Sequence, residues 1–322
     1  MAHAHLTLTV LSFIGILRDV SYDVIGIGYG AVDFLGIVPS YPSIDAKTEM
    51  EQVTIQGGGV TTTAMVAAAR LGARVSYIGV TGDDLIGKFA LAELQKENVD
   101  TSHVIIRHGS NSPFSLIVID KPTGKRNIFW TNAGITTVKP EELDKEHILS
   151  ARVLHVDNHE PAAATQAAKW ANDAGIPVLM DAGSMRPGVS ELIQYVDVLV
   201  ASHRFAIECT GETDLMTAAR KLMTGRRQIS VVTNGDNGCA CITRDDEFHL
   251  PAFKVDVVDT TGAGDVFHGA FSFGLAKGWD ARKIAVFASA VAAIKCTKLG
   301  GRLGIPAYEE TLMFLREHGH NL

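Results

Sequence analysis

The chain has 322 residues, of which 46% are hydrophobic and 20% charged, and its formal net charge at pH 7 is −7. This composition is sufficient for a substantial hydrophobic core and is unlike that of a disordered chain. The negative charge argues against a broad surface for nucleic acid or an anionic membrane, although backbone amides can still bind a single anion.

The cysteines and the N-terminal residues show no signal for a metal site or for export. The four cysteines form no C-x-x-C pair and no zinc-like cluster with histidine, which predicts a reduced, cytoplasmic protein. The apolar stretch 6–17 is too short to span a bilayer and follows no basic segment, so a secretory signal is the less favoured alternative. We expect residues 1–22 to form an N-terminal arm or an extended start, and residues 23–322 to form one domain.

The first half of this domain mixes strand-helix alternation with additional extended segments. An apolar run ending in glycine predicts a buried strand at 22–28, typical of the start of an α/β domain. The alternating elements predicted after it are a helix at 64–71, a strand at 75–79, a helix at 85–97 and a strand at 104–107. The additional extended segments are 34–38, 51–55, 114–119 and 126–131. These segments predict a small separate sheet built from about residues 34–56 and 113–131.

The second half returns to regular alternation. The predicted elements are strands at 153–156, 177–180, 196–200 and 229–233, with a helix at 162–174. This order predicts a three-layer α/β/α fold with a mostly parallel central sheet. A β-like run at 253–258 then precedes an apolar stretch at 266–276.

The run Asp259-Thr-Thr-Gly-Ala-Gly-Asp265 carries the strongest chemical signal. Glycines at 262 and 264 let successive amides turn toward one point, and a helix N-terminus adds partial positive charge there. Asp265 could accept the proton of an attacking hydroxyl while these amides hold a phosphoryl group in transfer. The alternative is that Asp265 only caps the helix.

These residues resemble the ribokinase-like, or PfkB, family of carbohydrate kinases. The C-terminal signature of that family matches 259–265, and its earlier signature matches Gly58-Gly59, the Ala-rich 64–72 and Gly82-Asp83-Asp84. The resemblance runs from about residue 23 to the C-terminus. It implies a ribokinase-like kinase domain in which the small sheet is a lid. The implied reaction transfers the γ-phosphoryl group of ATP to a primary hydroxyl of a ketose or ribose-like sugar. Mg²⁺ is the implied cofactor, and the implied assembly is a homodimer.

The resemblance also implies roles for individual residues. Asp265 matches the general base, with Gly262, Ala263 and Gly264 as the anion hole. The positions that match sugar-binding residues are Asp33, Gly58, Gly59 and Thr63, the last standing where ribokinases usually carry asparagine. The positions that match nucleotide-binding residues are Thr233, Gly235, Gly238 and Ser289. Asp259 and Thr261 match a site for a monovalent cation such as K⁺.

Two features of the sequence bear on the metal and the substrate. An Asn-x-x-Glu motif that organises magnesium in many members is replaced by Ser202-His-Arg-Phe205, so Mg²⁺ would depend on nucleotide phosphates, water or other carboxylates. The C-terminal motifs look especially like those of sulfofructose kinases, and Lys47 fits a lysine that faces the anionic end of their substrate. The partners of that lysine are replaced here by Asn158 and by Trp130 or a neighbour, which favours a ketose-like substrate over a sulfonated one.

Several alternatives remain from the sequence. The run 26–31 fits a G-x-G-x-x-A fingerprint of an NAD-dependent oxidoreductase, but the β-rich segment after it argues against the required helix. A non-catalytic sugar- or nucleotide-binding protein is the second alternative. His155 and His159 are expected to supply at least one residue of the sugar cleft, and His268 to pack or hydrogen-bond near Asp265.

Overall fold

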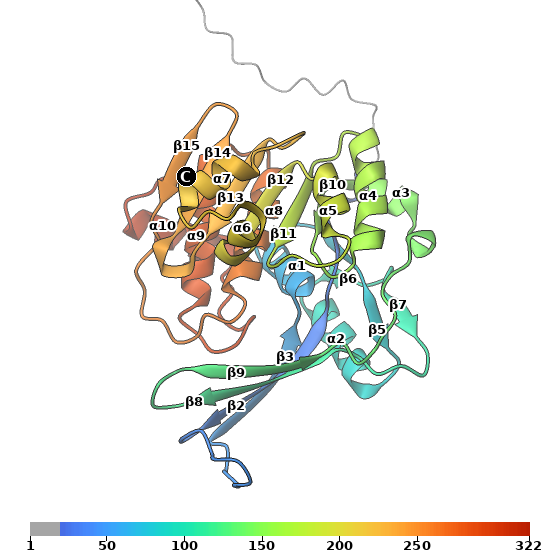
Figure 1. Ribbon diagram of the computed structural model, residues 1–322. Helices are drawn as coiled ribbons and strands as arrows, with labels where there is room; N and C mark the ends of the chain where they lie inside the picture. Colours follow the sequence, from blue (N-terminus) through green and yellow to red (C-terminus); the bar gives the residue numbers. More distant parts are fainter. Residues whose placement is uncertain (1–19) are drawn as a thin grey trace, which may run out of the picture.

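The computed structural model describes residues 20–322, so residues 1–19 of the predicted arm lie outside the described residues. Within that range the main sheet has nine strands in the order β15-β14-β13-β12-β11-β10-β1-β4-β6 (Figure 1). All neighbours pair parallel except β13 with β14 and β14 with β15. The bounds are β15 (Glu247–Leu250), β14 (Cys239–Thr243), β13 (Ile229–Thr233), β12 (Val198–Ser202), β11 (Val178–Ala182), β10 (Ala151–Val156), β1 (Tyr22–Ile27), β4 (Val75–Ile78) and β6 (Val99–Asp100).

Helices cover both faces of this sheet, each over its own apolar core. One core lies beneath α1 (Val60–Arg70), α8 (Ala263–Ala276), α9 (Ala281–Lys295) and α10 (Tyr308–Glu317). The other lies beneath α3 (Lys145–Leu149), α4 (Pro161–Asp173), α5 (Val189–Leu192), α6 (His203–Thr210) and α7 (Leu215–Leu222). The predicted three-layer α/β/α architecture is therefore confirmed.

A second sheet projects from the main body and has the order β3-β2-β8-β9 (Figure 1). Its strands are β3 (Gln52–Gly58), β2 (Ala31–Val38), β8 (Phe114–Asp120) and β9 (Arg126–Thr131). They come from the segments in which the sequence predicts a separate sheet, while its action as a lid stays a prediction. The remaining elements are β5 (Val80–Gly82), β7 (Ile105–Arg107), α2 (Leu85–Lys96), η1 (Pro140–Glu142), η2 (Ile193–Tyr195) and η3 (Gly235–Asn237).

The backbone conformation corrects the expected strand at 253–258 and decides between the alternatives for 26–31. The β-like run at 253–258 is not a strand: β15 ends at Leu250, Pro251 lacks an N–H, and Val258 donates only to the carbonyl of Cys296 at the end of α9. The glycines of 26–31 lead into strand β2 and not into a helix, so the dinucleotide-binding alternative is wrong. Among residues 20–322, no helix has the length and apolarity needed to cross a membrane.

Candidate active site

Four aspartates gather where the carboxyl ends of the parallel strands meet α8 and the second sheet. Asp157 follows β10, Asp181 lies near the end of β11, Asp33 lies in β2 and Asp265 in the first turn of α8. Each of the other three raises the pKa of Asp265 by its negative charge, which shows that the group shares one electrostatic environment. The carboxyl edge of an open α/β sheet is the usual place for a ligand.

Asp265 is available for chemistry and does not cap its helix. The residue that precedes α8 is Gly262, and Asp265 is the third residue within the helix. Its carboxylate makes no hydrogen bond to any residue in the range 20–322. Burial is the main cause that raises its pKa well above the usual value, with Asp181 next, while Lys295 opposes the shift. A free carboxylate of raised pKa suits a general base.

Unsatisfied amides surround the same helix start. The N–H groups of Gly262, Gly264 and Asp265 donate to no acceptor among the described residues, whereas Ala263 donates to the carbonyl of Thr260. The predicted amide set therefore needs one correction, because the third open N–H belongs to Asp265 and not to Ala263. Gly262 has φ +73, and a Cβ there would come within 3.0 Å of Gly301 Cα. These amides and the helix dipole together form a ready site for an anion.

Asp33 lies on the face of the second sheet that meets this site. It pairs in register with Gln56 and Ser115, and all three side chains are buried. Burial raises the pKa of Asp33, while Arg302 and a hydrogen bond from Ser115 oppose the shift. A Cβ on Gly58 would lie 2.3 Å from the Asp33 carboxyl group, so only glycine leaves Asp33 in place. The structure thus brings Asp33 and Gly58 together, as the sequence predicts.

Arg302 is a site residue to which the sequence analysis assigns no role. Its guanidinium is buried, donates to the carbonyl of Gly58 at 2.8 Å and lies 3.4 Å from Thr63 Oγ1. Thr63 therefore contacts Arg302, and its role in sugar binding stays a prediction. Gly59 has φ +90, and a Cβ there would approach Ala31 N to 2.7 Å. This glycine holds the start of α1 against the backbone before β2.

The positions predicted for a monovalent cation are already densely hydrogen-bonded. Asp259 Oδ1 accepts from the amide and hydroxyl of Thr261, and its Oδ2 accepts from Gly300 N at 2.8 Å. The fully buried Lys295 donates from Nζ to the Asp259 carbonyl at 2.9 Å. Burial acts to raise the pKa of Asp259, but the bonds from Thr261 and Gly300 bring it below its usual value. An ammonium group is therefore already bound beside Asp259.

The residues predicted for the nucleotide lie in and beside the hairpin of β13 and β14. Thr233 ends β13, and the turn through η3 returns at Gly238, whose φ is +78 and where a Cβ would lie 2.0 Å from Leu250 O. Gly235 also has positive φ, +53, and faces open space. Ser289 on α9 acts on the thiol of Cys239, the residue after Gly238, and lowers its pKa against the larger effect of burial. The structure places all four predicted residues at one edge of the sheet.

Two predicted substrate residues lie elsewhere than expected. Lys47 is exposed in the loop between β2 and β3, which Figure 1 shows at the outer tip of the second sheet. Asn158 is buried and donates to the carbonyl of Ser184, so its amide supports the loop after β11. As direct substrate contacts, both residues stay predictions.

Of the two histidines expected near the sugar cleft, His159 lines a cavity and His155 does not. His155 does not line a cleft, because it lies inside β10, fully buried, with Nδ1 2.9 Å from the hydroxyl of Ser272. His159 does reach a cavity and stacks on Tyr29 with ring centroids 4.6 Å apart. His268 packs near Asp265 as expected, with Nδ1 2.7 Å from Asp181 Oδ2, although the contact is not aligned as a hydrogen bond.

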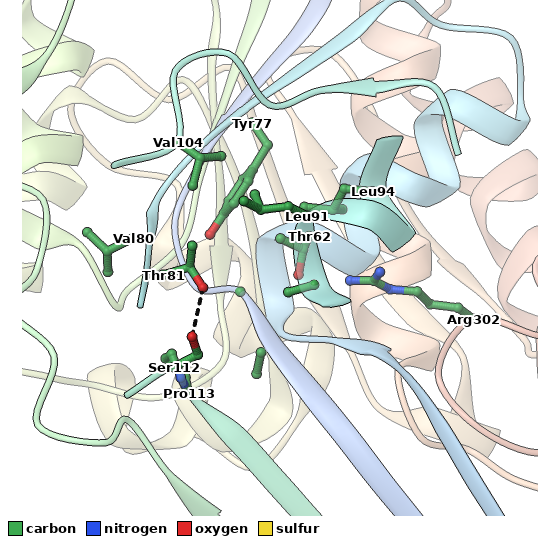
Figure 2. A pocket seen from close by; sticks show the side chains of 13 residues that line it. Thr62, Tyr77, Val80, Thr81, Leu91, Leu94, Val104, Ser112, Pro113 and Arg302 are labelled. Carbon is green, nitrogen blue, oxygen red and sulfur yellow. Dashed lines mark hydrogen bonds between the residues drawn. The ribbon is translucent and has the colours of Figure 1, made fainter. Parts of the chain in front are cut away.

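A smaller and a larger cavity adjoin the site within residues 20–322, and the larger one has room for a substituent of a ligand. The smaller, about 20 Å³, is mostly apolar and lies between Tyr77 and Leu91, with Arg302 at one end (Figure 2). It holds no more than a single water. The larger, about 100 Å³, is lined from the body by Tyr29, His159, Glu160 and Arg186 and from the second sheet by Trp130, among others.

The segment that replaces the Asn-x-x-Glu motif caps a helix. Ser202 accepts from Phe205 N at the start of α6 and donates to the carbonyl of Gly183. His203 contacts the carbonyl of Thr213, and Arg204 pairs with Glu208. Across residues 20–322, no group of three or more Asp, Glu, His or Cys side chains is arranged to hold a metal by itself.

Comparisons with known proteins agree with this geometry. The family model described as "pfkB family carbohydrate kinase" matches residues 23–307. "Probable fructokinase-2" of Arabidopsis thaliana is 27% identical over 318 residues, covering 91% of this chain and 95% of its own length. The "ATP-dependent ribose-1-phosphate kinase" of Halopiger xanaduensis is 28% identical, with 87% and 93% covered. The crystal structure of a ribokinase from Thermotoga maritima superposes with a TM-score of 0.78 at 25% identity, covering 92% of this chain and 99% of that one.

Proposed function

This chain belongs to the pfkB family of carbohydrate kinases, and we propose that it transfers the γ-phosphoryl group of ATP to a primary hydroxyl of a ketose or ribose-like sugar. One observation carries this proposal. At the start of α8, an unbonded carboxylate of raised pKa, Asp265, lies beside three unsatisfied amides. This pairing is what in-line phosphoryl transfer to a hydroxyl requires.

In the proposed mechanism, Asp33 accepts hydrogen bonds from sugar hydroxyls, and Gly58 leaves room for its carboxylate. The primary hydroxyl attacks the γ-phosphorus and gives its proton to Asp265, while the bond from that phosphorus to the ADP oxygen breaks. The amides of Gly262, Gly264 and Asp265 hold the oxygens of the moving phosphoryl group. Thr233, Gly235, Gly238 and Ser289 would border the nucleotide.

The acidic site suits a magnesium ion that the nucleotide brings with it. Mg²⁺ usually binds one or two protein carboxylates and takes its remaining ligands from phosphates and water, and the aspartates gathered at this site could supply such carboxylates. Asp181, which acts on Asp265 through its charge, would hold the ion's water shell. When bound, Mg²⁺ would neutralise charge on the phosphates.

An ATP-to-ADP coupled assay across sugars tests the proposal. The panel contains fructose, fructose 6-phosphate, sulfofructose, ribose, 2-keto-3-deoxygluconate and nucleosides. We expect turnover with at least one sugar. If none of these compounds is phosphorylated, a non-catalytic sugar- or nucleotide-binding protein becomes the better interpretation.

We also propose that Lys295 supplies the positive charge that a monovalent cation would bring beside Asp259. Its ammonium group is fully buried, bonded to the Asp259 carbonyl and close enough to Asp265 to oppose the rise in that pKa. Initial rates in KCl, NaCl and choline chloride at equal ionic strength should therefore differ by less than about twofold, an effect below 0.5 kcal/mol in barrier height. Strong activation by K⁺ over the other two salts would show that a cation site exists despite Lys295.

A homodimer is the expected assembly, formed through the outer face of the second sheet. Register and the two-residue period of strands place Phe34, Val53, Ile55, Leu116, Val118 and Phe129 on the face opposite Asp33. Of these, Val53 is 61% exposed and Phe129 55%, so an apolar patch faces solvent.

Light scattering after size exclusion should give a dimer mass for the natural chain and a monomer mass for Phe129→Glu. Met313→Glu is the matched control, because Met313 is also exposed and apolar but lies on α10. A monomeric natural chain, or a dimer in both variants, contradicts this interface.

A further inference from the structure

The larger cavity contains an arginine without a partner. The guanidinium of Arg186 makes no hydrogen bond or ion pair with any of residues 20–322, and its Nε is shielded from solvent. Its Cζ lies 5.9 Å from the ring centroid of Trp130, and its charge acts on Tyr29 and His159. A buried guanidinium atom with no acceptor is costly, which indicates an acceptor that a ligand supplies.

The side chains around Arg186 are also donors. Tyr29 Oη is buried and has no hydrogen-bond partner. Burial is the main cause that lowers the pKa of His159, so its ring is neutral at neutral pH and offers one N–H. The cavity of about 100 Å³ is thus lined by one cationic side chain and by two neutral side chains that carry hydrogen-bond donors. A water needs about 10–15 Å³ of such space, so the cavity holds several waters and is large enough for a carboxylate, phosphate or sulfonate group.

The carboxyl groups near this cavity do not oppose an anion strongly. Glu160 lines the cavity, but burial raises its pKa to about 8, so it carries a proton at neutral pH. Asp157 has its oxygens occupied by the amides of Tyr29 and His159 and by the hydroxyl of Thr61. Burial raises the pKa of Asp157 as well.

The cavity adjoins the reacting centre. Tyr29 and His159 flank Asp157, and Asp157 is one of the three aspartates that act on Asp265. Tyr29 also feels the charge of Asp33. A sugar held by Asp33 with its primary hydroxyl at Asp265 would therefore direct its other end toward Arg186. The loop that carries Arg186 is held by Asn158 through Ser184 and by Glu208, which accepts from Met185 N.

Resting on the proposed kinase function, we propose that the sugar substrate bears an anionic group at the end away from the phosphorylated hydroxyl, and that Arg186, with Tyr29 and His159, binds this group. Arg186 is then the residue that determines specificity, because its planar fork bonds a carboxylate, phosphate or sulfonate through two parallel N–H groups. Carboxylate, phosphate and sulfonate groups all present anionic oxygens to the guanidinium, and the sugars compared in the test identify which group the site binds.

The test compares fructose, which is neutral, with 2-keto-3-deoxygluconate, fructose 6-phosphate and sulfofructose, using Arg186→Gln, Arg186→Lys and the natural chain. Arg220→Gln is the matched control, since Arg220 is exposed and paired with Glu247 far from the site. We expect one anionic sugar to be the best substrate and Arg186→Gln to raise its KM by about 10- to 100-fold, with less than threefold change for fructose. Arg186→Lys keeps the charge but not the fork, and should give an intermediate KM.

Calorimetric titration of the same sugars without ATP separates this proposal from the kinase function. If no sugar is turned over but an anionic one binds more weakly to Arg186→Gln, the Arg186 site stands and the proposed function fails. Equal affinity for all variants overturns the Arg186 site, whether or not turnover occurs. The Arg186 site is also overturned if the natural chain prefers fructose to every anionic sugar. The same holds if Lys47→Ala raises the KM for anionic sugars while the Arg186 variants leave it unchanged. Melting temperatures identify a misfolded variant, and Arg186→Lys then carries the comparison.

Discussion

Replacing Asp265 with asparagine should lower kcat by about 10²- to 10⁴-fold, the usual contribution of a general base, while leaving sugar and ATP affinities nearly unchanged. Asparagine has the same shape but cannot take the proton of the attacking hydroxyl. Because Asp265 makes no hydrogen bond to the described residues, no structural contact is lost in the exchange. Steady-state kinetics beside calorimetry with sugar and a non-hydrolysable ATP analogue measures both effects.

Stability provides an internal control for this variant. Burial and three neighbouring aspartates raise the pKa of Asp265 in the folded protein above its value in the unfolded chain. Its ionised form therefore destabilises the fold at neutral pH, and the asparagine variant should unfold at equal or higher denaturant concentration. Asp256→Asn, an exposed carboxylate in the loop before α8, should change neither kcat nor stability. A near-normal kcat in Asp265→Asn would contradict the general-base role and would favour a structural role for Asp265 at the start of α8.

Replacing Asp33 with asparagine should instead weaken sugar binding, with KM for the sugar raised by roughly 10- to 150-fold, because bonds from hydroxyls to a charged acceptor are lost in the ground state. The KM for ATP should change by less than about threefold. Some loss of kcat is also expected, since in-line transfer depends on how the sugar is oriented. Competition with a sugar that lacks the reacting hydroxyl measures the binding loss directly.

The control for Asp33→Asn lies in the same sheet. Asp120 at the outer end of β8 accepts from Tyr41 N and the hydroxyl of Thr123, away from the site. Asp120→Asn should leave both KM values unchanged. If Asp33→Asn lowers affinity for ATP as strongly as for the sugar, Asp33 acts through the shape of the whole site and not as a sugar acceptor.

Much of the fold could be predicted because its signals are local. The buried strands are short apolar runs, and the glycines at 262 and 264 mark the start of α8 before any contact is known. The second sheet also follows from local patterns, namely prolines and a turn between extended segments. The run at 253–258 shows the limit of such reasoning: it alternates like a strand, but it pairs with no strand of the described residues, and the amides of Val258 and Asp259 donate instead to the carbonyl of Cys296.

The missed parts of the site depend on contacts between distant residues. Arg302 bonds Gly58 across 244 positions, and Lys295 bonds Asp259 across 36. A single basic residue has no spacing that identifies it, so Arg186, Arg302 and Lys295 become visible only when the fold shows which of them lack or find a partner. The free N–H of Asp265 could not be predicted for the same reason. Which amides at the start of α8 lack an acceptor becomes clear only from the folded backbone, where Ala263 donates to Thr260.

The central claim is that Asp265 acts on phosphoryl transfer itself. Rapid-quench measurement of sugar phosphate formed in the first turnover, with enzyme in excess over ATP and saturating sugar, isolates this step from product release. The natural chain should form product in one fast phase, and Asp265→Asn should form it at least about 10²-fold more slowly with the same amount of sugar bound. Equal first-turnover rates in the two proteins would contradict the assignment of Asp265 as the base.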